Sequence, residues 1–285
     1  MPPSRRPALG RRGGVVLGLL ALGALSFLAL GLEPAGLVPH AGGARIARDF
    51  LAAAVRPALE HEGRVPPGAR PFLLGLLDAL RRTVVFAAAS MSLGVVGGAL
   101  LGFAASSGWW SPAVADARGR PARLAPALQV AARVLIALLR SVHELLFAVV
   151  FLAAFGINTA GAVLALALPF SGVLAKVFSE LFDEAPRDAA RALQAAGATP
   201  AQAFFAGTLP RALPDMAAYA FYRFECAVRS SAVLGFFGFE TLGYGLERSF
   251  ENLHFREVWT YLYALIGLVL VLETWSASLR RRFVA

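Results

Sequence analysis

Five ionisable residues stand within stretches of the chain that are otherwise apolar: Arg140, Glu144, Arg223, Glu225 and Arg229. If these stretches cross a membrane, such residues are costly there and face a pore, a cavity or a partner. Because guanidinium binds phosphate-like oxygens bidentately, Arg223 or Arg229 could line a path for an anion. The alternative is structural. Arg140–Glu144 and Glu225–Arg229 are each spaced four residues apart, so each pair could neutralise itself and lock helices together.

Patterns of catalytic or metal-binding residues do not stand out. Cys226 is the only cysteine, and the four histidines are far apart in the sequence. A P-loop needs a lysine that follows glycine, but the sole lysine, Lys176, follows Ala175. We therefore predict a protein that is not an enzyme and holds no cofactor, so that any ATP and Mg²⁺ would bind to a separate ATPase. A membrane-embedded protease or acyltransferase would need a catalytic set, and the only candidate is His143 beside Glu144.

The composition is that of a membrane protein. Of the 285 residues 58% are hydrophobic and only 16% charged, against about 25% charged in soluble domains. A membrane crossing needs about 20 apolar helical residues. We predict an all-α membrane protein with about six transmembrane helices, the third of them a single long helix. The first could be a signal peptide, but its apolar length favours an uncleaved helix. The predicted spans are 13–32, 83–107, 124–156, 160–182, 217–239 and 258–279.

The net charge of +9 is carried almost entirely by arginine, which indicates contact with membrane lipid rather than with nucleic acid. Basic residues gather in the N-terminal tail, at 118–123, at 187–211 and at the C-terminus, so we expect both termini to be cytoplasmic. Residues 1–72 then comprise the tail, the first helix and an external amphipathic segment, whose apolar face would be Ile46, Phe50, Leu51 and Val55. Residues 73–285 form a core with five transmembrane helices.

The cytoplasmic loop 184–214 has strong helix-ending and helix-starting signals. Gly197 suits the left-handed turn that ends a helix, and Thr199, Pro200 and Gln202 form a capping box that starts the next one. We expect the second helix to end before Pro210. This element could simply be a well-capped loop. Binding of DNA by a helix-turn-helix is disfavoured because the loop is tethered between two spans and has few basic residues.

Glycines at 94, 97, 98 and 102 give the second predicted span a face of small residues. Such a face lets two helices approach closely. It predicts packing within one subunit, with a seam between two copies as the alternative.

The loop resembles a motif of the binding-protein-dependent ABC importer permeases, E-A-A-x3-G-x9-I-x-L-P. Ala192, Gly197, Leu209 and Pro210 match it, whereas Arg191 stands at the glutamate position and Gly207 at the isoleucine position. The resemblance implies that the loop docks into an ATPase subunit. The residues that it assigns to this coupling loop are Ala192, Gly197, Thr199, Pro200, Leu209 and Pro210.

Two further runs resemble the phosphonate-type branch of these permeases, whose members carry R-S-I-P-E-L and L-Y-R-F-E-x-x-V-R-S-x-x-V-L-G. Here residues 140–145 read R-S-V-H-E-L, and residues 222–235 read Y-R-F-E followed by V-R-S-S-A-V-L-G at 228–235. His143 replaces the usual proline, so we expect a straighter third helix there.

This resemblance implies a permease bundle (MetI-like) in a bacterial inner membrane, with partner ATPase subunits, an external or periplasmic solute-binding protein and a second permease copy in a homodimer. The implied function is ATP-driven import of phosphonate or a related phosphorus oxyanion by alternating access. An ion-gradient-driven secondary transporter for a small anion is the alternative, and it would predict internal inverted repeats.

Overall fold

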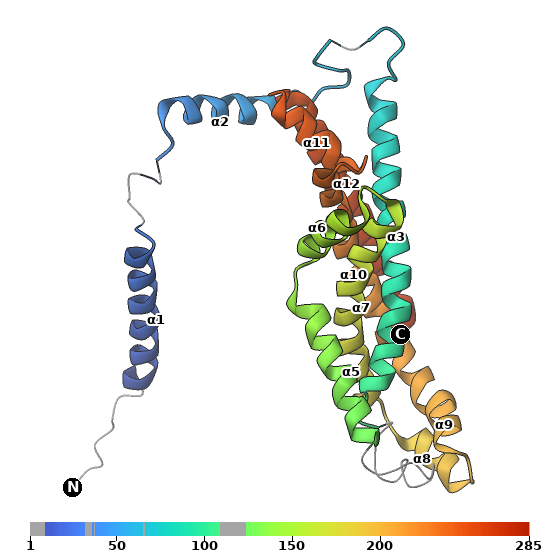
Figure 1. The fold of residues 1–285 in the computed structure, drawn as a ribbon. Helices are drawn as coiled ribbons and strands as arrows, with labels where there is room; N and C mark the ends of the chain where they lie inside the picture. The colour runs from blue at the N-terminus through green and yellow to red at the C-terminus, as the bar shows by residue number, and fades with distance from the viewer. Residues whose placement is uncertain (1–8, 32–35, 37, 65, 109–123, 285) are drawn as a thin grey trace, which may run out of the picture. The chain divides into compact units, whose positions relative to one another are not determined.

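The computed structural model describes residues 9–31, 36, 38–64, 66–108 and 124–284, and the regular elements among them are all helices. The chain divides into two compact units, residues 1–52 and 53–285. The predicted boundary near residue 72 stays a prediction, and the predicted basic loop at 118–123 lies outside the described residues. Figure 1 shows the elements by label.

The first unit contains α1 (Leu9–Ala29) and nearly all of α2 (Ala41–Ala53). The apolar part of α1, Gly13–Ala29, is shorter than the spanning helices described below. Since α2 falls within the predicted amphipathic segment and exposes Ile46 and Leu51, the expected helix is confirmed. Its place on the outer membrane surface stays a prediction.

The second unit is a helical bundle. Its long helices are α3 (Phe72–Ala105), α7 (Thr159–Glu184), α10 (Leu209–Val233) and α12 (Phe255–Val284), and its shorter ones include α5 (Leu124–Ser141) and α6 (Glu144–Phe155). Among the described residues, α3, α7 and α12 are long and apolar enough to cross a membrane, and α5 with α6 would make a fourth span as a bent pair. The all-α prediction is confirmed, while the number six stays a prediction.

Two connections cap the ends of this bundle. Between α7 and α10 lie α8 (Asp188–Ala195), α9 (Pro200–Ala203) and the π-helix η2 (Phe204–Thr208). Between α10 and α12 lie η3 (Leu234–Phe237) and α11 (Leu242–Glu251). Figure 1 shows α8 and α9 at one end of the bundle and α11 toward the other.

Helix α7 is the centre of the bundle, since 67% of its most apolar window is buried against 6% for α12. The glycine face of α3 packs along it. Added Cβ atoms at Gly98 and Gly102 would lie 2.6 Å from the Cβ of Leu174 and 3.0 Å from that of Phe178. The predicted packing within one subunit is therefore confirmed, and it explains why small residues recur every four positions on α3.

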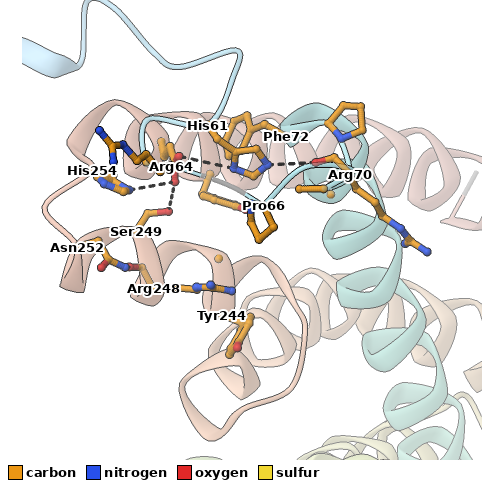
Figure 2. A pocket seen from close by; sticks show the side chains of 17 residues that line it. His61, Arg64, Pro66, Arg70, Phe72, Tyr244, Arg248, Ser249, Asn252 and His254 are labelled. Atoms are coloured by element: carbon orange, nitrogen blue, oxygen red, sulfur yellow. Dashed lines mark hydrogen bonds and ion pairs between the residues drawn. The ribbon is translucent and has the colours of Figure 1, made fainter.

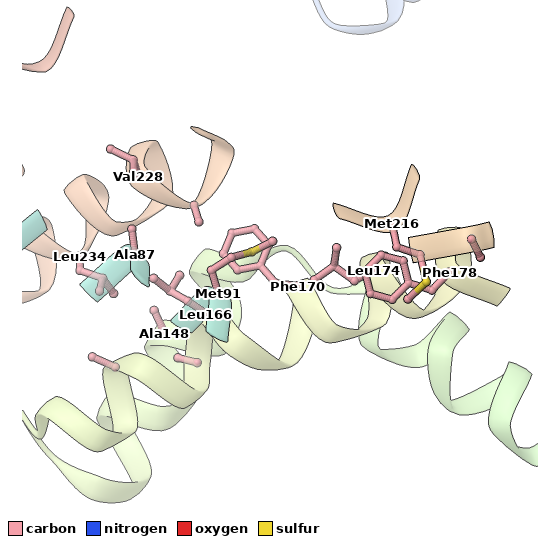
Figure 3. Close-up of a cluster of buried hydrophobic side chains, with 14 of the residues drawn as sticks. Ala87, Met91, Ala148, Leu166, Phe170, Leu174, Phe178, Met216, Val228 and Leu234 are labelled. Atoms are coloured by element: carbon pink, nitrogen blue, oxygen red, sulfur yellow. The ribbon is translucent and has the colours of Figure 1, made fainter. Parts of the chain in front are cut away.

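Figure 3 shows the apolar core that this packing produces. Ala87 and Met91 of α3 contribute to the same cluster as Leu166 and Phe170 of α7 and Val228 of α10. Leu166 and Val228 have no exposed surface. Because lipid is as apolar as the core, these contacts stabilise the bundle through close packing rather than through exclusion of water.

The third predicted helix is broken. The axes of α5 and α6 differ by 89°, so the prediction of a single long helix over 124–156, straighter without proline, was wrong. His143 has extended backbone and its Nδ1 accepts a hydrogen bond from Leu145 N at 3.3 Å. The histidine side chain thus caps α6 and satisfies a backbone donor that a continuous helix would have paired internally.

A buried polar cluster ties three helices together beside the core. Ser231 Oγ of α10 donates to the carbonyl oxygen of Thr83 in α3 at 2.8 Å. The backbone N–H of Leu242, at the start of α11, donates to Thr83 Oγ1 at 3.0 Å. Thr83 and Ser231 have no exposed surface. Because buried polar groups are costly without partners, these bonds fix how α10 meets α3.

Candidate functional site

The loop between α7 and α10 contains the predicted turn. Gly197 has φ +91°, the left-handed conformation that glycine adopts at little cost. Its N–H donates to Gln194 O at 3.0 Å, and Ala198 N–H donates to Leu193 O at 2.9 Å. These two bonds make up the Schellman motif at the end of α8. The helix–glycine–helix expectation is therefore confirmed.

The second helix begins as expected and then departs from the prediction. Thr199 N donates to Gln202 Oε1 at 2.9 Å, and Gln202 N donates to Thr199 Oγ1 at 3.4 Å, which completes the capping box around Pro200. However, α9 lasts four residues and runs through η2 directly into α10. The expectation that this helix ends before Pro210 was wrong. Leu209 and Pro210 are the first residues of α10, where a missing N–H is tolerated.

Gly207 stands where the resembled motif has isoleucine, and its surroundings leave no room for a larger residue. A Cβ atom at this position would lie 2.8 Å from Ala190 N and 2.9 Å from Ala190 Cα. The backbone of η2 therefore packs directly on α8. The departure from the motif is explained by this close contact between the two elements.

Phe204 of η2 connects this loop to the transmembrane helices. Its ring lies edge-to-face against Phe103 of α3, with centroids 4.9 Å apart, and against Phe182 of α7, with centroids 5.3 Å apart. Only 8% of Phe204 is exposed. Phe204 thus joins the loop to both helices by direct ring contacts. Sequence reasoning missed Phe204, although an aromatic residue after a capping box in a loop that is otherwise rich in small residues was a usable signal.

The outer surface of the loop is formed by small and polar side chains. Arg191, Ala192, Gly197 and Thr199 are exposed, and Pro200 is half-buried. Arg191, at the motif's glutamate position, forms no ion pair with the residues that the structure describes. Among the described residues of the loop, Arg187 also forms no ion pair, whereas Arg211 lies 3.9 Å from Asp188. The loop thus presents a well-capped surface with two unpaired arginines, Arg187 and Arg191.

The first predicted charge pair is not formed. Arg140 lies at the end of α5 and is exposed, while Glu144 begins α6 beyond the bend. Glu144 Oε1 instead accepts a hydrogen bond from Ser230 Oγ of α10 at 2.8 Å. This bond ties α6 to α10, so the locking of helices expected of Glu144 does occur, with Ser230 as its partner in place of Arg140.

On α10, two of the predicted cations converge on the single cysteine. Arg229 Nη2 lies 3.6 Å and Arg223 Nη1 3.9 Å from Cys226 Sγ, and both are hydrogen-bond donors to the sulfur. Arg223 also lies over the ring of Tyr219, 5.9 Å from its centroid. The ion pairs among the residues that the structure describes do not include the predicted pair of Glu225 with Arg229. The three-residue spacing on either side of Cys226 could have revealed this cluster.

The sequence was compared with family models and with known proteins. Residues 117–284 match the model of the binding-protein-dependent transport system inner membrane component. The chain is 39% identical over 155 residues to the phosphite transport system permease protein PtxC of Stutzerimonas stutzeri, covering 53% of this chain and 55% of that protein. It is 33% identical over 159 residues to the phosphate-import permease protein PhnE of Mycolicibacterium smegmatis, covering 56% of this chain and 30% of that protein.

Two solved structures have a fold similar to that of this chain. A methionine ABC transporter, MetNI, in an inward-facing conformation has a TM-score of 0.61 and 21% identity, covering 75% of this chain and 99% of that chain. An amino acid ABC transporter has a TM-score of 0.60 and 17% identity, covering 74% and 95%. At these identities the likeness shows the fold alone. The chain spans about half the length of the first of the curated relatives, 55% of it. Because the family model matches more than half of the chain, this protein belongs to the binding-protein-dependent transport system inner membrane components.

Proposed function

We propose that this chain is the permease subunit of an ATP-driven ABC importer of the bacterial inner membrane, and that its cargo is phosphonate or a related phosphorus oxyanion. Family membership supports the importer over an ion-gradient-driven transporter. The names of the relatives, which are permeases for phosphite and phosphate, support the class of cargo. The observation that carries the proposal is the rigid α8–α9 loop joined to α3 and α7 through Phe204.

In this proposal the exposed surface of the loop docks onto a partner ATPase subunit, which binds ATP and Mg²⁺. A docking element must be stiff, because a flexible loop would absorb the displacement that ATP binding produces. The bonds around Gly197 and Thr199 supply that stiffness. Movement of the loop then shifts α3 and α7 through Phe204 and alternates access to the path between the two sides of the membrane.

The path for the anion is proposed to run beside the Arg223–Cys226–Arg229 cluster of α10. Guanidinium groups offer several donors in a fixed geometry that suits tetrahedral oxyanions. The thiol is a weak acceptor and does not neutralise them. A permease must also release its cargo, so affinity is proposed to reside in an external solute-binding protein, with weak contacts here.

A second permease copy is proposed to complete the path, in a homodimer. The apolar window of α12 is only 6% buried within the chain, which leaves surface for lipid or for another copy. Both termini are proposed to be cytoplasmic.

The coupling role is tested at Gly197. A left-handed conformation costs a β-branched residue about 1–2 kcal/mol, so Gly197→Val should lower uptake per ATP hydrolysed by roughly five- to thirtyfold. Asparagine tolerates this conformation, so Gly197→Asn is the matched control and should stay near the wild type. Both are measured in proteoliposomes with the ATPase and the binding protein. Wild-type coupling in a folded Gly197→Val protein would contradict the role of the loop.

The path role is tested at α10. Cys226 is the only cysteine, so a thiol reagent reports on one site in this chain. An anionic methanethiosulfonate reagent should label Cys226, and phosphonate supplied with the binding protein and ATP should slow the labelling. Arg229→Gln should reduce uptake, whereas Arg81→Gln, a change at an exposed arginine on α3, should not. If Arg229→Gln leaves both uptake and coupled hydrolysis normal, the path does not use this cluster.

A further inference from the structure

A cavity of about 660 Å³ lies in the second unit, at the end away from α8 and α9. It is lined by the 61–72 segment, α11 and the start of α12. Figure 2 shows Arg64 and Arg70 on the 61–72 segment, at opposite sides of the lining, and Arg248 on α11. Tyr244 and Asn252 add polar groups to the lining. No sequence motif pointed to this place.

The walls of the cavity are held by one buried carboxylate. Glu257 is 6% exposed. Its Oε1 accepts a hydrogen bond from Glu62 N at 2.7 Å, and its Oε2 accepts one from Ser249 Oγ at 2.7 Å. The Nδ1 atoms of His61 and His254 lie 3.9 Å and 3.8 Å from it. Glu257 thus joins the 61–72 segment to α11 and α12, and its negative charge lies in the wall of the cavity.

Further bonds hold this segment and the residues just before it in place. Thr260 Oγ1 donates to Ala58 O at 2.7 Å, and Arg256 N donates to Glu62 Oε2 at 3.1 Å. The ring of Phe72 is buried and lies edge-to-face against Tyr261, with centroids 5.6 Å apart. The cavity is therefore formed before any ligand enters, which reduces the ordering cost of binding.

The three arginines that line the cavity have no acidic partner. Within the described residues none of Arg64, Arg70 and Arg248 forms an ion pair. Arg82 of α3 contrasts with them, because it pairs with Asp78 at 2.9 Å and also with Glu240. Against its three arginines the cavity lining contains one carboxylate, Glu257, so positive charge is in excess, and such an excess concentrates anions.

The acidic groups nearby do not cancel this charge. A neighbouring cavity of about 210 Å³ is lined by Asp78 and Glu240, and also by Arg70. Both of these carboxylates are paired with arginines of α3. Glu247 and Glu251 lie on α11 and are not part of the lining. Arg70 lines both cavities, whereas Arg64 and Arg248 line only the larger of the two.

We infer that this cavity is a second anion site, which binds a small phosphorus oxyanion through Arg64 and Arg248. Guanidinium groups bind such oxygens bidentately. The volume lies within the range of about 300–1,000 Å³ typical of ligand pockets, so the anion enters with part of its hydration water and binds weakly. Binding itself is independent of ATP coupling. Only the placement of the site on the outer face, where cargo leaves the binding protein, rests on the proposed function.

The test uses the full chain in detergent, without ATP or partner proteins, titrated calorimetrically with inorganic phosphate and with methylphosphonate. We expect saturable binding that weakens at least tenfold in Arg248→Gln and in Arg64→Gln and is unchanged in Arg81→Gln. Thermal unfolding checks that each variant is folded. The absence of saturable binding, or equal binding by all variants, would overturn the inference. Coupling measured at Gly197 is unaffected by either result, so the two proposals fail separately.

A phospholipid headgroup has the same oxyanion chemistry, and a second titration separates it from free phosphate. Short-chain phosphatidylglycerol is added below its micellar concentration, before and after saturation with phosphate. Binding of phosphate in the presence of the lipid supports a site for the soluble anion. Binding of the lipid alone, lost in Arg248→Gln, would overturn the assignment to a soluble anion.

Discussion

Phe204 makes aromatic contacts between the α8–α9 loop and helices α3 and α7, and it lies outside the capped turn at Gly197 and Thr199. Its ring makes edge-to-face contacts with Phe103 and Phe182. Such contacts are worth about 0.5–1.5 kcal/mol each, so together they supply about 1–3 kcal/mol. A coupling free energy of that size corresponds to roughly a 5- to 150-fold effect. We therefore expect Phe204→Ala to lower uptake per ATP hydrolysed within that range.

The assay compares ATP hydrolysis with uptake in proteoliposomes that contain the ATPase and the external binding protein. ATP hydrolysis should persist while uptake falls, because the ATPase still turns over but α3 and α7 no longer move with the loop. Replacing a buried phenylalanine by alanine costs about 3–5 kcal/mol in a soluble core, so Phe204→Leu is made in parallel as the milder change. Phe236→Ala, at a phenylalanine that is 49% exposed, is the control. Folded Phe204→Ala and Phe204→Leu proteins with wild-type coupling would refute the reasoning.

Three further predictions follow from close contacts. Gly98→Ala should lower the thermal unfolding midpoint, because the added methyl would lie 2.6 Å from the Cβ of Leu174 in α7. Gly75→Ala, which has nothing within 4 Å, should leave the midpoint unchanged. Equal midpoints for the two variants would contradict the packing. Gly207→Ile, which restores the motif residue, should reduce coupling by forcing η2 away from α8; improved coupling would contradict that contact. Ser230→Ala should destabilise the fold by about 1–3 kcal/mol, because the Glu144 carboxylate loses a hydrogen-bond donor. Chemical unfolding in detergent measures this change, and an unchanged stability would contradict the role of the Ser230–Glu144 bond.

Local signals in the sequence were sufficient for several elements. The charge-free run before Lys176 and the Asn158 cap define α7, and Gly197 with Thr199 defines the turn between α8 and α9. The glycine spacing of α3 predicted its packing on α7. In each case the deciding interaction lies within a few residues along the chain or follows from helical periodicity.

Two breaks in regularity were predicted wrongly for related reasons. The absence of proline at position 143 favoured a straight helix, yet the histidine side chain itself replaces a backbone partner and allows the 89° bend. Conversely, Pro210 favoured a helix end, yet the π-turn of η2 carries the chain into α10 without one. Residue type alone did not determine whether the helix continued in either case.

The remaining features depend on long-range contacts. Glu62 and Glu257 are 195 residues apart in sequence, and the basic cavity exists because their bonds bring the 61–72 segment onto α11 and α12. The contact of Ser230 with Glu144 likewise spans 86 residues. Such pairings follow from how the helices are arranged in space, and periodicity in a single sequence does not specify them.

The most direct measurement is uptake of labelled phosphonate, or of phosphite, by proteoliposomes that contain this chain and its partner ATPase. We predict accumulation that requires both ATP on the α8–α9 side and the solute-binding protein on the opposite side, and that does not change when ion gradients are collapsed. Accumulation driven by an ion gradient without ATP, or independent of the binding protein, would contradict the assignment as the permease of an ATP-driven importer.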